Sequence, residues 1–165
     1  MSSRYDVPRA APEPLRAVQL FVNSIDREHE LDWLDEWFAE HGPVVEPARA
    51  RPLREAFRAL ALANNGAPLD PGAVETLNTA AARLSLRLDA DGSPHIADGG
   101  DALDRLVAIV FAAMLDGSWG RLKACRNCRW SFYDGSPNRS ATWCSMQLCG
   151  NRAKTRTYRT RRRAV

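Results

Sequence analysis

The sequence predicts a mainly α-helical fold that ends in a small metal-binding module. Apolar residues recur at intervals of three and four over most of residues 14–115, which is the period of amphipathic helices. Four cysteines form two close pairs near the C-terminus, and a strongly basic stretch follows them. At 165 residues, the chain has the usual length of one domain, or of one domain with a small appended module.

Four amphipathic helices are expected before residue 85. Their apolar residues give the ranges 14–24, 29–40, 52–64 and 71–84. Signals that end helices support these limits, because His41-Gly42-Pro43 follows the second range and Asn64-Asn65-Gly66 follows the third. Pro71 suits the first turn of the fourth helix, where a backbone N–H is not needed.

A short β-hairpin and a fifth helix are predicted next. Leu84, Leu86 and Leu88 alternate with polar residues, which is the period of a strand, and a turn at residues 91–92 precedes a returning strand at 95–97. Asp101 is a suitable N-cap for an apolar helix over residues 101–115. Residues 1–117 are therefore expected to form a helical domain with one small hairpin, and residues 118–165 a second module.

The net charge of +3 hides an asymmetry between these two parts. Residues 118–165 contain twelve of the 23 Lys and Arg but one of the 20 acids, Asp134, which gives +11, so residues 1–117 carry −8. All four cysteines lie in the basic part. Opposite charges in one short chain suggest two roles, with a polyanion as the partner of the basic part.

The N-terminal residues bear on the compartment. Residues 1–14 are polar and contain proline, without the apolar stretch of a signal peptide. No segment reaches the roughly 18–20 apolar residues of a membrane span. A cytoplasmic protein without a membrane partner is expected, and cysteines stay reduced in that compartment.

The spacing of the cysteines predicts a zinc site. Two residues lie between Cys125 and Cys128, four lie between Cys144 and Cys149, and fifteen lie between the two pairs. Two close thiolate pairs suit one tetrahedral Zn²⁺ ion with a structural role, because four sulfur ligands leave no position for a catalytic water. Free core cysteines or a redox pair are the alternatives, but the βαβ pattern that accompanies a redox pair is absent.

Residues around the cysteines have expected supporting roles. The aromatic residues Trp130, Phe132 and Tyr133 are expected to cover the metal, because so small a module has little other core. Asp134 and Ser136 are expected to brace the loop between the cysteine pairs through hydrogen bonds.

The basic tail is the candidate nucleic-acid contact. Residues 151–163 contain seven cations and no acid, so they are expected to be frayed alone and to gain order on a polyanion. Ser145 could cap a helix here, and Gly150 marks a point where that helix can break. A solvated tail that only aids solubility is the alternative.

Base contacts are assigned to the start of the tail. In the major groove, Asn can pair with adenine and Arg with guanine, which favours Asn151 and Arg152 for direct reading. The complete set of candidate DNA contacts is Asn151, Arg152, Lys154, Arg156, Arg159, Arg161, Arg162 and Arg163.

The C-terminal motifs resemble a known family. CRNCRWSFYDGS at residues 125–136, WCSM at 143–146 and CGNRAK at 149–154 closely resemble the CGNR zinc-finger family. FVNS at residues 21–24, the acidic helix after it and the strand near residues 84–89 resemble the N-terminal ABATE domain of that family. Gly135 departs from the motif, which often has Thr there. The resemblance implies a bacterial, stress-induced transcription regulator whose ABATE domain senses a ligand or signal.

The first functional hypothesis is therefore a zinc-containing regulator that binds duplex DNA and senses a small molecule or partner through its helical domain. The acidic domain could also fold back on the basic tail. Regulators of this kind are often homodimers, although nothing in the sequence specifies an interface. The alternative is an RNA- or ribosome-associated zinc protein in which Trp130, Phe132, Tyr133 or Trp143 stacks on unpaired bases.

An enzyme in the helical domain is a third and weaker hypothesis. The sequence contains no phosphate loop, dinucleotide fingerprint or nucleophile elbow. His29, His41 and His95 are scattered, with no carboxylate or second histidine at ligand spacing. No catalytic residue is therefore expected.

Overall fold

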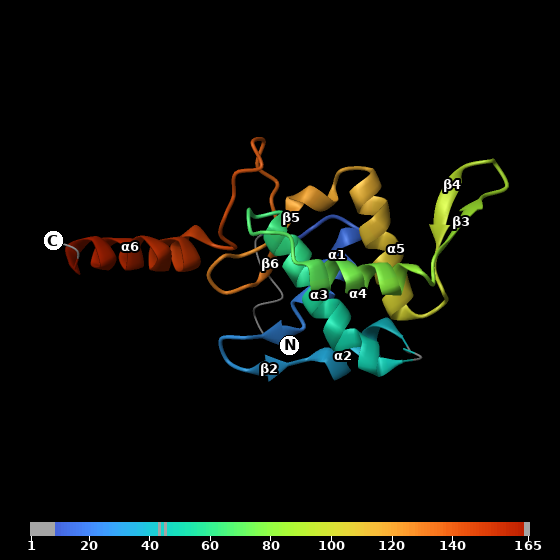
Figure 1. Ribbon diagram of the computed structural model, residues 1–165, viewed down its shortest axis with the longest axis horizontal. Helices are drawn as coiled ribbons and strands as arrows, with labels where there is room; N and C mark the ends of the chain where they lie inside the picture. The colour runs from blue at the N-terminus through green and yellow to red at the C-terminus, as the bar shows by residue number, and fades with distance from the viewer. Residues whose placement is uncertain (1–8, 43, 45, 164–165) are drawn as a thin grey trace.

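The computed structural model describes residues 9–42, 44 and 46–163. Five helices form a body, from which a β-hairpin and a sixth helix project at opposite ends of the long axis (Figure 1). The helices are α1 (Leu15–Val22), α2 (Leu34–His41), α3 (Ala50–Ala63), α4 (Pro71–Ala81), α5 (Ala102–Leu115) and α6 (Asn151–Arg163). Among the described residues, no helix combines the length and apolar character that crossing a bilayer would need.

Short elements connect these helices. Each of three two-stranded antiparallel sheets is a hairpin: β1 (Ile25–Asp26) with β2 (Leu31–Asp32), β3 (Ser85–Leu88) with β4 (Pro94–Ala97), and β5 (Leu122–Ala124) with β6 (Ser131–Tyr133). Single helical turns lie at η2 (Pro47–Arg49) and η3 (Trp119–Arg121), and a π-helical turn, η4 (Met146–Gly150), precedes α6. The mainly α fold with a β-hairpin and a C-terminal cysteine cluster is thus confirmed.

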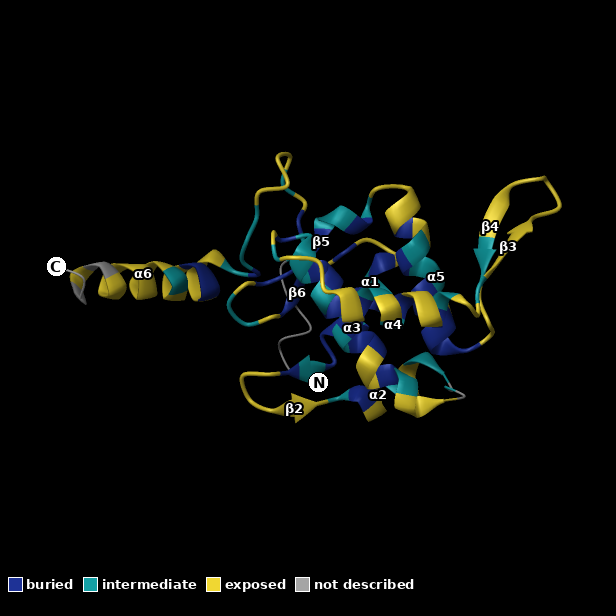
Figure 2. Cartoon of the chain, viewed as in Figure 1, coloured by how far each residue is buried: buried dark blue, intermediate teal, exposed yellow. Residues whose placement is uncertain are grey.

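The main core lies between α1, α3 and α5, whose inner faces are buried (Figure 2). Phe21, Phe57 and Val107 are fully buried there. These residues occur at the helical spacing on which the predicted ranges rested, so the buried faces follow from the sequence. The core continues past the helices to Trp119 and Leu122, at the start of β5.

The predicted N-cap of α5, Asp101, is confirmed, and Asp70 caps α4 in the same way. Asp70 accepts hydrogen bonds from the backbone N–H groups at the start of α4, and Asp101 accepts one from Asp104 N at the start of α5. Asp104 is fully buried and also accepts bonds from Arg49 (2.5 Å) and Arg83 (2.9 Å). This ion cluster ties η2 and the end of α4 to the N-terminus of α5.

The predicted start of the second helix is wrong. The helix begins at Leu34 rather than near His29, and a second small hairpin, β1–β2, occupies the residues before it. The Asp26 carboxylate accepts bonds from the N–H groups of Glu28 and His29, which closes a turn that competes with helix. Asp32 is held by the buried Arg54 at 2.7 Å, a long-range contact that its local sequence does not indicate.

The ends of α2 and α3 agree with the stop signals. His41 is the last residue of α2, and its Nδ1 donates to Trp37 O at 2.9 Å. Pro43, part of the same signal, lies outside the described residues. After α3 the chain turns at Gly66, whose φ of +83° lies in the left-handed region.

Candidate metal centre and nucleic-acid interface

The four cysteines converge on one point. Cys125 and Cys128 lie on the tight turn between β5 and β6, which is closed by bonds from Cys125 N to Trp130 O (2.8 Å) and from Arg129 N to Cys125 O (3.0 Å). Cys144 precedes η4 and Cys149 lies within it. The four Sγ atoms all lie within 4.8 Å of one another, although fifteen residues separate the pairs in sequence.

The sulfur cluster fits a tetrahedral zinc ion. The Sγ atoms of Cys128 and Cys144 are 3.5 Å apart, and those of Cys144 and Cys149 are 3.7 Å apart. Zn–S bonds of about 2.3 Å give a tetrahedron with edges of roughly 3.8 Å, so these separations are close to those of a zinc–thiolate site. The four cysteines could therefore bind one zinc ion.

Charge gives a second reason for a cation at this point. Hydrogen bonds from Cys128 and Cys144 hold the pKa of Cys125 far below its usual range. The bond to Cys125 in turn raises the pKa of Cys128 to about 12, and the pKa of Cys144 also rises. Without a cation, one thiolate in the cluster thus suppresses ionisation of its neighbours, whereas a bound Zn²⁺ would stabilise all four thiolates.

The cysteines and their aromatic neighbours form a second, smaller core. Trp130 and Phe132 are buried against Cys125, Cys144 and Cys149. Three of the five buried residues of this cluster are thus cysteines. We call residues 122–150 the cysteine module, because its interior consists largely of these sulfurs.

Asp134 braces the loop of the cysteine module, as the sequence predicted. Its carboxylate accepts bonds from Lys123 Nζ (2.8 Å), Ser136 Oγ (2.6 Å) and Ala141 N (2.9 Å). Burial alone would raise the pKa of Asp134, but these hydrogen bonds outweigh it and hold the pKa well below its usual range. A buried ion pair therefore fixes the loop between the cysteine pairs.

Polar side chains from the helices hold the cysteine module against the body. Asn23, just after α1, accepts from Ser131 N (2.7 Å) and donates to Ser131 O (2.9 Å). Asn65, just after α3, donates to Ala124 O (2.8 Å) and Thr142 O (2.9 Å). These two bidentate contacts pair backbone groups of β5, β6 and the loop with side chains of the body.

Further contacts extend this attachment. Asn64 donates to Trp119 O and Leu122 O at 2.9 Å, and Arg58 donates to Arg129 O at 3.0 Å. The sequence analysis treated Asn64 and Asn65 as helix-stop signals and placed Asn23 near the end of the first helix, and it missed the contacts of all three with the cysteine module. The clustering of polar residues at helix ends could have indicated such contacts. The sequence did not show, however, which backbone groups these side chains would bind.

Helix α6 follows the last cysteine almost directly. Ser145 Oγ accepts from Leu148 N at the start of η4, as predicted, but Gly150 does not break the helix. The π-helical turn passes into the thirteen residues of α6, which extends away from the body (Figure 1). The predicted frayed tail is therefore a helix in this structure.

Two contacts fix the first turns of α6. Arg152 pairs with Glu28, on the β1–β2 hairpin, at 2.8 Å. Arg156 donates to Asn127 Oδ1 at 3.2 Å, and Asn127 Nδ2 in turn lies 3.6 Å from Cys149 Sγ. The helix direction is thus linked both to the sulfur cluster and to the acidic body.

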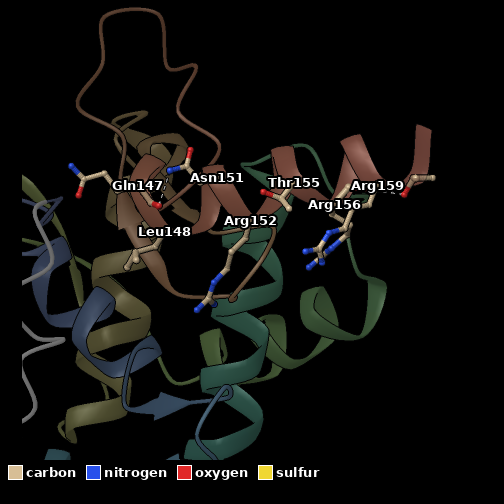
Figure 3. A pocket seen from close by; sticks show the side chains of 8 residues that line it. Gln147, Leu148, Asn151, Arg152, Thr155, Arg156 and Arg159 are labelled. Atoms are coloured by element: carbon tan, nitrogen blue, oxygen red, sulfur yellow. Dashed lines mark hydrogen bonds between the residues drawn. The ribbon is translucent and has the colours of Figure 1, made fainter. Parts of the chain in front are cut away.

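One side of α6 forms a shallow groove (Figure 3). Arg152 and Arg156 extend from the same side of the helix there. The residues that line it recur at intervals of four: Gln147, Leu148, Asn151, Arg152, Thr155, Arg156, Arg159 and Thr160.

Only some of the residues predicted to contact DNA line this groove. Asn151, Arg152, Arg156 and Arg159 line it, whereas Lys154 does not. The Arg162 guanidinium lies 5.8 Å from the Tyr158 ring centre. The side chains of Arg161 and Arg163 lie outside the described part of the structure. Gln147 and Thr155 were missed by sequence reasoning, although their helical spacing from Asn151 could have indicated them.

Comparison with known families agrees with this geometry. Residues 121–162 match the CGNR zinc finger, and residues 15–118 match ABATE, described as "putative stress-induced transcription regulator". The second match alone covers more than half of the chain. The chain belongs to the ABATE family. This ABATE-family protein carries the two regions in the order that its sequence predicted, and no curated protein matches it.

One family description is that of a zinc finger, and the other is that of a putative transcription regulator. Two histidines of this ABATE-family protein do have carboxylate neighbours, contrary to the expectation from spacing. His29 Nδ1 lies 2.8 Å from Asp26, and His95 Nδ1 lies 3.2 Å from Asp89. Each pair lies on a different hairpin, and neither histidine lines a groove described here, so the pairs are explained as hairpin contacts.

Proposed function

We propose that this protein is a transcription regulator that binds duplex DNA through α6. In this proposal Cys125, Cys128, Cys144 and Cys149 hold one structural Zn²⁺ ion that fixes where the helix begins. The observation that carries the proposal is α6 itself: thirteen residues with seven cations and no acid, exposed along most of their described length and beginning two residues after Cys149 (Figure 2).

The dimensions and charge of α6 suit duplex DNA. A helix of this length spans about 20 Å, and the major groove, about 12 Å wide, admits one α-helix. Contacts between Lys or Arg and phosphates release counterions, so the cations supply affinity whatever the base sequence. The groove-lining Asn151 and Arg152 are the proposed base-reading residues, and Arg156 and Arg159 lie on the same side of the helix.

Residues on the body are proposed to receive the signal. A groove of about 600 Å³ between η2, α3 and α4 is lined by small and apolar residues together with four charged ones: Glu46, Arg49, Glu75 and Arg83. Both arginines bind the buried Asp104 at the start of α5. A small molecule in this groove would therefore contact the ion cluster that joins three elements of the body.

The RNA-binding alternative has less support. Trp130 and Phe132 are buried in the cysteine module and cannot stack on unpaired bases without unfolding it. Tyr133 and Trp143 are partly exposed. Competition between a DNA duplex and a single-stranded RNA at one salt concentration distinguishes the two proposals, because preference for the RNA would overturn binding by α6 in the major groove.

The decisive experiment selects ligands from a random pool of duplexes with the zinc-loaded full chain. We expect an enriched sequence motif, and a slope of log K against log salt of about −5 if six cations meet phosphates. Asn151→Ala should relax the motif at one position, whereas Arg159→Ala should weaken binding to all sequences. Arg105→Ala, an exposed arginine on α5, is the matched control. Selection of no motif would overturn the regulator proposal.

A further inference from the structure

The β3–β4 hairpin exposes an apolar face. Leu86 and Leu88 are 82% and 71% exposed, which is unusual for residues of a regular strand. They share one face of the hairpin with Pro94 and Ile96, which pair with them across the sheet. Arg87, Asp89 and His95 lie on the opposite face, where His95 and Asp89 are 3.2 Å apart. A two-stranded hairpin that stands away from its body has little stability of its own.

The two edges of this hairpin differ. Asp89 N donates to Ser93 O at 2.9 Å, so residues 89 and 93 form a hydrogen-bonded pair. Because such pairs alternate along an antiparallel ladder, Leu86 and Leu88 direct their N–H and C=O groups to the outer edge of β3. Pro94 and Ile96 occupy the corresponding positions of β4, and Pro94 has no N–H to donate. The edge of β3 is thus open, whereas that of β4 is partly blocked.

We propose that β3 is a dimerisation strand that pairs antiparallel with β3 of a second copy of this chain. The pairing would convert two isolated hairpins into one four-stranded sheet and join their apolar faces. It would also satisfy the open N–H and C=O groups of Leu88 on the outer edge of β3. This proposal does not depend on DNA binding.

The charges on β3 favour a second copy of this chain as the pairing partner, and they favour one alignment of the two strands over another. With Leu88 opposite Leu88 of the second copy, Arg87 lies opposite Asp89 of that copy, and the reverse pair forms by symmetry. Centring the pair on Arg87 instead would place two arginines opposite each other, which is unfavourable. The β3 edge is therefore complementary in charge to itself in the register centred on Leu88.

The test measures the molar mass of the zinc-loaded full chain by sedimentation over roughly 1–100 µM, because so small an interface predicts weak association. We expect a monomer–dimer equilibrium that the Leu86→Ser/Leu88→Ser double variant weakens at least tenfold. Leu115→Ser, which changes a leucine of similar exposure (79%) on α5, should leave the association unchanged. A wild-type chain that stays monomeric throughout this range would overturn the proposal.

A charge exchange tests the register without changing the apolar face. Arg87→Asp and Asp89→Arg should each abolish association, because each places like charges opposite each other. The double variant should restore it, because the opposite charges meet again. Far-UV circular dichroism checks that each variant is folded. Failure of the double variant to recover association would overturn the β3–β3 register.

Discussion

At the scale of single residues, the buried ion pair of Lys123 and Asp134 shows how the loop between the two cysteine pairs is held in place. The pair lies at the base of the loop between the cysteine pairs, and both side chains are almost completely buried. Lys123 Nζ also donates to Arg139 O and Ala141 O. Removing one partner leaves the other buried and unpaired, which costs far more than losing an exposed pair.

We expect Asp134→Asn to lower the free energy of unfolding of the zinc-loaded protein by about 3 kcal/mol, because Lys123 would remain buried without a counter-charge. Urea unfolding measures the change. Asp116→Asn, which removes an exposed carboxylate that accepts from Ser118 N, is the control and should cost well under half as much. Equal effects of the two substitutions would contradict this account.

The pH dependence of the same variant follows from the sign of the pKa shift. The folded-state pKa of Asp134 is lowered, so its contribution is complete above the unfolded-state pKa of about 3.9 and is lost as the pH falls through the folded-state pKa. The difference in unfolding free energy between wild type and Asp134→Asn should therefore be constant from about pH 5 to 8. A difference that shrinks within this window would show that another group carries the effect.

At the scale of elements, the asparagines that follow α1 and α3 connect the two parts of the molecule. Asn65→Ala leaves the buried carbonyls of Ala124 and Thr142 without this donor, which should cost about 1–3 kcal/mol. Hydrogen exchange over residues 122–142 should accelerate accordingly. Asn78→Ala, an exposed position on α4, should leave that exchange unchanged. Unaltered protection in Asn65→Ala would remove the docking role assigned to this side chain.

The metal should stabilise one set of elements and not the others. The core cluster around the cysteines has five buried residues, three of them cysteines, so we expect this part of the module to lose its fold without the ion. We expect a strong chelator to abolish hydrogen-exchange protection in β5, β6 and α6 while protection in α3 and α5 persists. An α6 that stays protected after complete metal removal would contradict the proposed link between zinc and the helix.

Helix prediction succeeded where local patterns and long-range packing agreed. The apolar periods of α3 and α5 predicted which of their residues are buried, and Asp101 was correctly predicted as the N-cap of α5. The predicted start of α2 was wrong because the turn at Asp26 and the ion pair of Arg54 and Asp32 stabilise a hairpin. The residues of this hairpin nevertheless have helical spacing in the sequence. Arg54 lies 22 residues from Asp32 in the sequence, so the residues around Asp32 do not indicate this ion pair.

At the scale of the whole molecule, the acidic body and the basic helix do not lie against each other along their length. Helix α6 extends away from the body, and the body reaches it at Glu28, on the β1–β2 hairpin, which pairs with Arg152 (Figure 1). The acidic domain therefore does not fold back along the basic tail as hypothesised, and the ion pair of Glu28 and Arg152 is the contact between them described here. If α6 binds DNA as proposed, Glu28 pairs with an arginine that a DNA phosphate or base would otherwise contact.

We expect Glu28→Gln to raise DNA affinity about two- to fivefold at low salt, because it frees Arg152 and removes one negative charge beside the helix. A smaller effect at high salt is expected as screening increases. Fluorescence anisotropy with a labelled duplex measures both. Glu40→Gln, an exposed acid on α2, is the control for net charge. Equal gains from both variants would show that Glu28 acts only through net charge.

The proposed dimer would have a consequence for DNA binding. The β3–β4 hairpin and α6 lie at opposite ends of the long axis, so a pair joined through β3 places its two α6 helices at the far ends of the assembly (Figure 1). Such a pair would contact two separate duplex segments rather than adjacent half-sites one helical turn apart.

The sequence by itself determined the helical body, its caps, the β3–β4 hairpin and the four cysteines of the metal centre, because each depends on a local period or on fixed spacing. Tertiary structure alone decided how the cysteine module is attached and where α6 points. Asn23, Asn65 and Glu28 meet partners 59 to 124 residues away, and such contacts depend on how helices pack rather than on neighbouring residues. Tertiary structure also decided that the basic tail is an exposed helix. The first turn of α6 is positioned by the cluster of four cysteines, and this cluster forms only when the two distant cysteine pairs come together.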